Sequence, residues 1–598
     1  MAERKLRTAV LVVHGMGSQR PLETVGGIVN AVWFDNDKHD DDTKRVWTHP
    51  QPSGVDIDLT VKTTSAVEGT SDKRNIDFHE LYWAHHMSET KAVAVLLWLF
   101  ELARRGPSFK TGLNGLWWCG AVFLCLLLLS VALISFRLTV WIADVAQAPE
   151  GVVVTILLMV SIAMAAGLLA AAATGWWRLC KGLAKGLLYV ALVVAVAVLA
   201  TYLFSVWASQ YAGAPFDWLR SAAVLASIFL PIGSAYLATR LLMGRYGLRV
   251  FSWTIGLSLL FYVGYSLLAR CFNDSFTATL LEGRLPWSMA SNWSVVAAWT
   301  IIGAYVVVNA AFLQPYLGDA ARYFRSSPAN VAVRRAIRKD AVDTLDQLHR
   351  SRNYDRIVVV AHSLGTVVAY DMLRAYYSRI CPRIAIGENL NPEFDEIDKG
   401  GLDCVRQRKL GRALVAKLAR ASAILSPAKR GEGYKPATNE DVDAWLVTDF
   451  VTLGSPLTHA VYLIADENDG ALIDDEFAKR IRERELPTCP PAKLDRDGLL
   501  AFKSSNNKLR LHHGGLFGMT RWTNLYFPAI NIFWGDAIGG KVAPVFGECV
   551  VDVPVSTDCA GNTDGFKHTS YWKTDCEPDK RNGPHIAALR EAVNLEDK

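Results

Sequence analysis

The sequence lacks several features that would assign it to a class directly. Its 598 residues include only ten cysteines, and no two of them form a CxxC pair, so neither a disulfide scaffold nor a zinc ribbon is expected. A net charge of +5 is small for this length, so no nucleic-acid partner is expected. The sequence shows no internal repeat and no low-complexity tract. A secretory signal is not expected either, because the first apolar run, 9–13, is too short for one.

Charged residues are also few, at 20%, whereas hydrophobic residues make up 51% of the chain, and this balance excludes disorder. Much of the apolar content lies in uncharged runs of about 19–26 residues, close to the ~20 that cross a bilayer as a helix. These six runs are 116–135, 152–177, 187–207, 221–239, 250–269 and 293–313. The sequence therefore predicts a block of six transmembrane helices over residues 114–314.

The connecting segments predict the orientation of this block. Lysine and arginine concentrate before the first run, after the second, after the fourth and after the last. Basic residues favour the cytoplasmic side, which places both termini there. Ion pumps and proton relays usually need ionisable groups within their spans, and these runs contain none. The block is therefore expected to act as an anchor, scaffold or substrate entry, with transport as an alternative.

Outside this block, apolar strand-like segments alternate with amphipathic ones. Segment 356–360 is apolar after its first residue, as buried parallel strands are. Strands are predicted at 7–13, 55–62, 75–84, 356–360, 449–453, within 523–534 and at 549–553, and helices at 89–105, 330–350, 366–377 and 410–425. This alternation predicts a mainly parallel α/β sheet. The domains would be 1–113 and 315–598, which build one sheet, and the block 114–314 inserted between them.

The clearest chemical signal is Ala361-His362-Ser363-Leu364-Gly365, between the strand 356–360 and the helix 366–377. A serine in a tight strand-to-helix turn needs small residues two positions before and after it. The string resembles the nucleophile elbow of the α/β-hydrolase superfamily, with Ala361 in place of the first glycine. The resemblance implies that Ser363 is a nucleophile for ester, thioester or amide hydrolysis through an acyl-serine, without a metal or cofactor. The alternative is a capping serine in an ordinary turn.

A second motif, His14-Gly15-Met16-Gly17, follows the strand 7–13 and is similar to the oxyanion turn of lipases. Acyl transfer needs two backbone N–H donors directed at the developing oxyanion. The resemblance assigns them to Met16 and Leu364. Taken alone, the motif would be read as a plain glycine turn.

The superfamily places its triad in the order serine, acid, histidine. Asp536 follows the apolar segment 530–534, and His568 lies further on in a C-terminal loop, so these two residues are the predicted acid and base. The histidine would take the serine proton, and the carboxylate would fix its tautomer. Asp552 and Asp449 remain alternatives for the acid, and His585 for the base.

The other histidines are predicted to have structural roles. His79-Glu80 begins a zincin-like string, but Trp83 stands where the second histidine would be. His85 and His86 are adjacent, and neighbours on a strand point to opposite faces, so joint metal binding is not expected. Ser455, in Gly-Ser-Pro after the strand 449–453, is read as structural. The insertions 382–445 and 466–500 are candidates for a lid.

Together these features predict a membrane-embedded serine esterase or lipase that acts on lipid or acyl esters beside the bilayer. The hydrolase domain and both termini would be cytoplasmic. The alternatives are a hydrolase-like scaffold or sensor without turnover, and a transporter with a regulatory domain.

Overall fold

The structure is a computed structural model. It describes residues 7–17, 20–33, 44–50, 60–66, 75–87, 318–324, 328–351, 353–384, 391–421, 444–464, 473–493, 498–503, 509–529, 534–557, 565–574 and 583–595. The chain divides into two compact units. One comprises Met1–Glu89, Lys110–Gly112 and Arg322–Lys598, and the other comprises Thr90–Phe109 and Leu113–Ala321. Apart from the first residues of α10, every element below belongs to the first unit.

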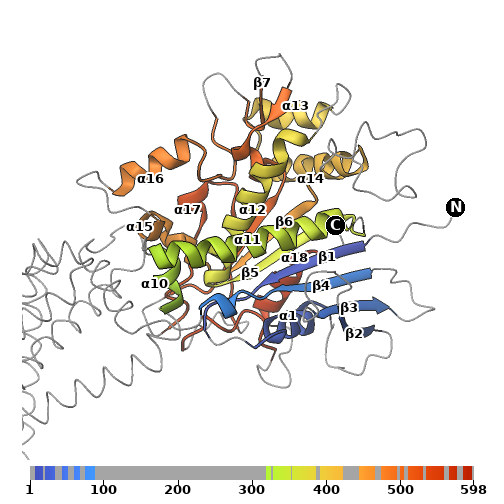
Figure 1. Cartoon of the computed structure of the whole chain (residues 1–598), viewed down its shortest axis with the longest axis vertical. Coiled ribbons are helices and arrows are strands. Elements are labelled where there is room, and N and C mark those ends of the chain that lie inside the picture. The colour runs from blue at the N-terminus through green and yellow to red at the C-terminus, as the bar shows by residue number, and fades with distance from the viewer. Residues whose placement is uncertain are drawn as a thin grey trace, which may run out of the picture. The chain divides into compact units, whose positions relative to one another are not determined.

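The first unit is built on an eight-stranded sheet in the order β10-β9-β6-β5-β1-β4-β3-β2 (Figure 1). Its strands are β1 (Arg7–Val13), β2 (Lys44–Pro50), β3 (Thr60–Ala66), β4 (Asn75–Leu81), β5 (Arg356–His362), β6 (Val447–Leu453), β9 (Arg521–Tyr526) and β10 (Val551–Pro554). Six of them pair in parallel, whereas β2 and β3 extend one edge in antiparallel pairing. A separate small antiparallel pair joins β7 (Ala501–Lys503) to β8 (Leu509–Leu511).

The longer helices lie on both faces of the sheet: α11 and α12 lie over one, and α1 and α18 over the other (Figure 1). The α-helices are α1 (Glu23–Trp33), α10 (Gly318–Phe324), α11 (Pro328–Arg350), α12 (Leu364–Ile380), α13 (Asn391–Lys399), α14 (Cys404–Ala421), α15 (Ala460–Ile464), α16 (Ile473–Arg482), α17 (Ala543–Phe546) and α18 (Pro584–Val593). Short 3-10 turns are η1 (Ala84–Met87), η4 (Cys381–Arg383), η6 (Pro456–His459) and η7 (His513–Gly518).

Strand and helix periodicities together explain the core. Along β5 every residue is buried, because helices cover both sides of a parallel sheet. Val358 and Val360 point into the cluster formed with α1 and α18. In α1, Val25, Ile28 and Val29 are spaced for one helix face, and all three are buried in the same cluster.

The two ends of the chain build this sheet jointly. Strand β1 lies between β4 and β5 and pairs with both in parallel, with Val10 opposite Val358. A disulfide between Cys404 of α14 and Cys549 adds one covalent link within the C-terminal part. The carboxyl ends of β1 and β5 therefore lie side by side, which is where the two predicted motifs begin.

Several predicted elements differ from the structure in extent. The predicted strand 55–62 corresponds to β3, and the edge strand β2 was not expected from the sequence. Helices α1 and α18 were also missed, although Pro584 at the first position of α18 and Asn594, left-handed at its end, are usual helix boundaries. The predicted helix 89–105 and most of the segment 530–534 lie outside the described residues.

The structure corrects the predictions of a six-helix transmembrane bundle and of a multi-pass membrane location. No helix in the described part of the chain is long and apolar enough to cross a membrane. A span needs ~20 consecutive, mainly apolar residues. Helix α11 has 23 residues, but charged side chains such as Arg334, Asp340 and Asp346 occur along its length. The structure supports an α/β fold with a mainly parallel sheet, and the predicted runs at 116–313 lie outside the described residues.

The sheet core predicts a large effect of one aromatic truncation. Phe450 of β6 is fully buried, and its ring lies 5.2 Å from that of Trp522. We expect Phe450→Ala to lower the free energy of unfolding by about 3–5 kcal/mol, because it leaves a cavity. In α14, 71% of Val405 is exposed, so Val405→Ala should change this free energy by less than about 0.5 kcal/mol. Urea unfolding of the full chain measures both, and equal effects would contradict this description of the core.

Candidate active site

Ser363 occupies a strained turn between β5 and α12. Its backbone has φ 52° and ψ −132°, a conformation that non-glycine residues rarely adopt. Such strain persists only where the surroundings hold it, and it is frequent at functional sites. The Thr366 hydroxyl donates a 2.7 Å hydrogen bond to the Ser363 carbonyl oxygen. The Thr366 oxygen also lies 2.7 Å from the Ser455 hydroxyl, which links the turn to the end of β6.

The structure brings Ser363, His568 and Asp536 into one hydrogen-bonded chain. The Ser363 Oγ lies 2.7 Å from the His568 Nε2, and the His568 Nδ1 lies 2.9 Å from both carboxylate oxygens of Asp536. All three residues are buried. If Nδ1 carries the proton that it donates to Asp536, Nε2 is left to accept the serine proton, which is the arrangement needed for a general base.

Asp536 is held in its ionised form by donors on several sides. Burial alone would raise its pKa, but the charge of His568 and the hydrogen bonds outweigh burial and hold the pKa well below its ordinary value. The backbone N–H groups of Ile538 and Gly539 each donate to Oδ1 at 2.9 Å. The Tyr571 hydroxyl donates to Oδ2 at 2.7 Å. This carboxylate can therefore orient and stabilise a charged imidazole.

The loop that carries His568 is attached to the acid turn through its backbone. The Lys567 N–H donates to the Gly535 carbonyl at 2.9 Å, and the Gly535 N–H donates to the Gly565 carbonyl at 3.0 Å. Tyr571 adds a side-chain link, because its hydroxyl also accepts the Phe527 N–H at 3.2 Å. The acid and the base are thus positioned as one assembly after β9. The sequence pattern around His568 includes Tyr571, but it did not predict this contact with the acid.

His362, next to the serine, supports the same loop. Its Nε2 lies 2.8 Å from the His568 carbonyl oxygen and donates to it. Its ring meets the Trp572 ring edge-on at 4.7 Å. Burial, followed by the charge of His568, lowers the pKa of His362 to about 3, so the ring is neutral and places no second positive charge beside the base. The sequence indicated His362 as part of the motif without predicting this contact.

The turn His14-Gly15-Met16-Gly17 lies against the serine turn. A Cβ on Gly15 would come within 3.0 Å of the Ser363 Cβ, and one on Gly365 within 2.2 Å of the His14 carbonyl oxygen. Leu364 is the first residue of α12, and N–H groups in the first turn of a helix lack intrahelical acceptors. The structure therefore brings both predicted donor segments to the side of Ser363.

His14 and Trp83 hold this turn in place. The Trp83 backbone N–H donates to the His14 Nε2 at 3.0 Å, and the Trp83 indole N–H donates to the His14 carbonyl at 3.0 Å. The His14 Nδ1 donates to the Gly15 carbonyl at 2.7 Å. The two rings stack with centroids 5.0 Å apart. Trp83, which the sequence indicated as part of the predicted strand 75–84 and as a failed metal ligand position, is thus a support of the turn.

The alternative acids and base have other partners. Asp449 pairs with Arg521 at 2.7 Å. Asp552 accepts hydrogen bonds from Asn524 and from two backbone N–H groups. His585 donates from Nε2 to the Lys573 carbonyl at 3.0 Å. These contacts give each residue a structural role away from the Ser363–His568 hydrogen bond.

Comparison with protein-family models, with curated protein sequences and with solved structures returned no match for this chain.

The contact between the two turns predicts a larger effect of substitution at Gly365 than at Ala361. Gly365→Ala would force a methyl group into the His14 carbonyl, so we expect a loss of about 1–3 kcal/mol in the free energy of unfolding. If Ser363 reacts with a fluorophosphonate, displacement of the turn should also slow this labelling about 100-fold. Ala361→Gly removes a buried methyl group without adding a clash, and we expect a change of only about 1 kcal/mol. Similar labelling rates in both variants would contradict the described contact.

Buried histidines predict acid sensitivity of the fold. Burial lowers the pKa of His14 and His459 to about 4 and that of His362 to about 3, from an ordinary value of 6.5. Between pH 6.5 and these values the unfolded chain binds more protons, so its population grows on acidification. Each histidine should lower the free energy of unfolding by up to ~1.4 kcal/mol for each pH unit in this window. Urea unfolding from about pH 7 to about pH 4.5 measures the slope, and a flat profile would contradict this assignment.

Proposed function

We propose that the protein is a serine hydrolase that cleaves carboxylic esters or thioesters through an acyl-serine intermediate. The observation that carries the proposal is the buried chain from the Ser363 Oγ to the His568 Nε2, at 2.7 Å, and from the His568 Nδ1 to Asp536, at 2.9 Å. A nucleophile within hydrogen-bond reach of a base, itself oriented by a third group, is the arrangement that activates a serine.

The proposed reaction uses each member of this chain in turn. As the Ser363 Oγ attacks the substrate carbonyl carbon, its proton passes to the His568 Nε2, and Asp536 stabilises the imidazolium. The N–H groups of Met16 and Leu364 are the proposed donors to the oxyanion. Collapse breaks the bond to the leaving group, which takes the proton from His568. Water then attacks the acyl-serine with His568 again as base, releases the acid and restores the serine.

The electrostatic surroundings support the direction of proton transfer. The His568 Nδ1 is hydrogen-bonded to the ionised Asp536, whereas the neighbouring His362 and His14 are neutral because burial lowers the pKa of each. A charge on either neighbour would oppose protonation of His568. In the proposed site the acid is thus hydrogen-bonded to the one imidazole that receives the proton, and the two neighbouring imidazoles carry no charge.

Covalent labelling tests the nucleophile. We expect the full-length protein to react with a fluorophosphonate at Ser363, and Ser363→Ala to abolish this labelling. His568→Ala should reduce hydrolysis of a p-nitrophenyl ester by about 10⁴–10⁶-fold. Ser351→Ala is the matched control, because Ser351 is an exposed serine whose hydroxyl donates to the Leu348 carbonyl.

Unchanged labelling in Ser363→Ala would overturn the proposal. Absence of both labelling and ester hydrolysis in the folded wild type would instead favour a hydrolase-like scaffold without turnover. Parallel assays with an oxygen ester and an acyl thioester would define the leaving group.

A further inference from the structure

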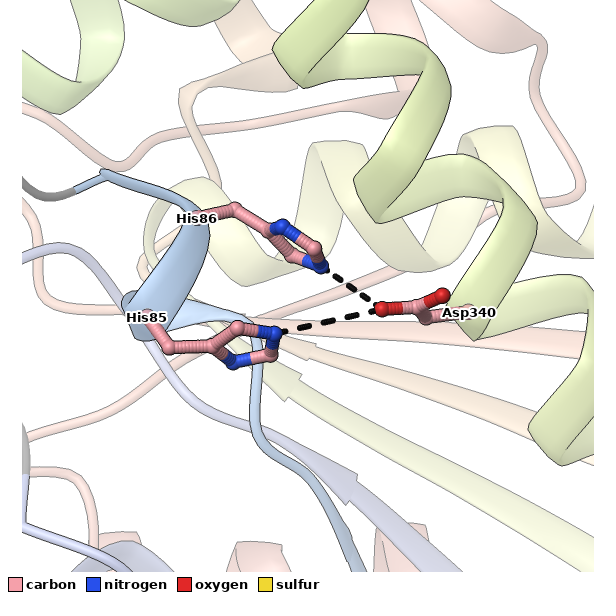
Figure 2. A group of neighbouring side chains, drawn as sticks. All are labelled: His85, His86 and Asp340. Carbon is pink, nitrogen blue, oxygen red and sulfur yellow. Dashed lines mark hydrogen bonds and ion pairs between the residues drawn. The ribbon is translucent and has the colours of Figure 1, made fainter. Parts of the chain in front are cut away.

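A second cluster of chemistry-bearing side chains lies outside the proposed triad. His85 and His86 belong to the 3-10 turn η1, after β4, and Asp340 belongs to α11 (Figure 2). One ligand atom from each side chain lies within 4.8 Å of the other two. The His86 Nε2 is 2.6 Å from the Asp340 Oδ2, and the His85 Nε2 is 4.0 Å from the same oxygen.

The tight turn brings together two side chains that a strand would separate. The expectation from the sequence was that neighbouring histidines point to opposite faces. Because η1 is a 3-10 turn, both rings instead point toward Asp340, and their centroids lie only 3.9 Å apart (Figure 2). Two imidazoles and one carboxylate thus converge on a small volume.

We propose that His85, His86 and Asp340 bind a divalent transition-metal cation of the zinc class. Imidazole nitrogen and carboxylate oxygen are preferred zinc ligands, and three protein ligands leave a fourth position for water. Tetrahedral coordination at ~2.1 Å separates ligand atoms by about 3.4 Å. The two observed separations from the Asp340 Oδ2, 2.6 Å and 4.0 Å, lie on either side of that value.

The surroundings favour a cation at this place. Neighbouring basic residues on α11 are paired with other carboxylates: Arg338 with Asp371 at 2.9 Å, and Lys339 with Asp343 at 3.2 Å. The Asp340 carboxylate instead contacts His86 and His85. The side chains of His85, His86 and Asp340 are 53%, 21% and 44% exposed, so an ion can reach them and the rings can adjust.

Binding would join two parts of the chain that lie far apart in the sequence. His86 and Asp340 are 254 residues apart in the sequence. A cation bound by both would therefore tie η1 to α11. The same turn is connected to the oxyanion segment, since the His85 and Tyr82 rings lie 6.0 Å apart and the Tyr82 and His14 rings 5.2 Å apart. The cation is thus expected to stabilise the fold at a point next to the proposed site, and its binding depends on no step of hydrolysis.

Zinc titration of the full-length protein after treatment with a chelator tests the site. We expect one equivalent of Zn²⁺ to bind in isothermal calorimetry and to raise the melting temperature. Asp340→Asn keeps the size of the side chain but removes its charge, and it should weaken binding of this equivalent about 100-fold. His85→Gln should also weaken zinc binding about 100-fold. Because His85 is more exposed, this second variant keeps the test valid if Asp340→Asn fails to fold. His513→Gln, at an exposed histidine on η7, is the control and should bind like the wild type.

Co²⁺ provides an independent probe, because its visible absorption reports tetrahedral coordination by nitrogen and oxygen ligands. Its spectrum in the wild type should disappear in Asp340→Asn and persist in His513→Gln. Equal zinc affinity in the wild type, Asp340→Asn and His85→Gln would overturn the proposal. An equal loss in His513→Gln, or no binding by the folded wild type, would also overturn it.

Discussion

The arrangement of the site depends on the parallel pairing of β1 with β5. Carboxyl ends of neighbouring parallel strands meet at one edge of a sheet, where open α/β folds place their ligands. Val13 and Ala361 stand opposite one another in this pair, so the turns that follow them emerge together. The contact is close enough that a Cβ on Gly365 would lie 2.2 Å from the His14 carbonyl oxygen. Without this pairing, the proposed nucleophile and its oxyanion donors would belong to unconnected segments.

The site also requires that the loop carrying His568 lie at the carboxyl ends of β1 and β5. Polar contacts hold the loop there. The bridge between Gly535 and Phe566 fixes the His568 loop to the acid turn, and His362 binds the same loop from the side of the serine. The His362 contact is buried, so losing its imidazole would leave the His568 carbonyl without a partner, which costs more than the contact itself gains. The geometry of the proposed triad is thereby coupled to the stability of the fold.

The sequence predicted those parts of the site that follow from local pattern and chain order. Ser363 was indicated by the strand–turn–helix context, and Asp536 and His568 by their order after it. The edge strand β2 could not be predicted in this way, because its stability comes from cross-strand pairing with β3 rather than from its own composition. The convergence of His85 and His86 could not be predicted either, because hydrophobic periodicity distinguishes strands from helices and does not identify a short 3-10 turn. The transmembrane prediction rested on apolar run length, a criterion that no helix among the described residues meets.

Gly454, in the Gly-Ser-Pro segment after β6, is a third position where the backbone must pass close to the proposed site. Its φ of +57° lies in the left-handed region, which glycine enters without steric cost. A Cβ at this position would also lie 2.6 Å from the Asp536 Oδ2 and 2.7 Å from the Tyr571 Cε2. The segment was read from the sequence as structural, but its glycine leaves room for the acid and for the tyrosine that orients it. Three strand ends, those of β1, β5 and β6, therefore each contribute a glycine where backbone must approach the proposed site. At these three positions a small residue lies where segments distant in sequence meet.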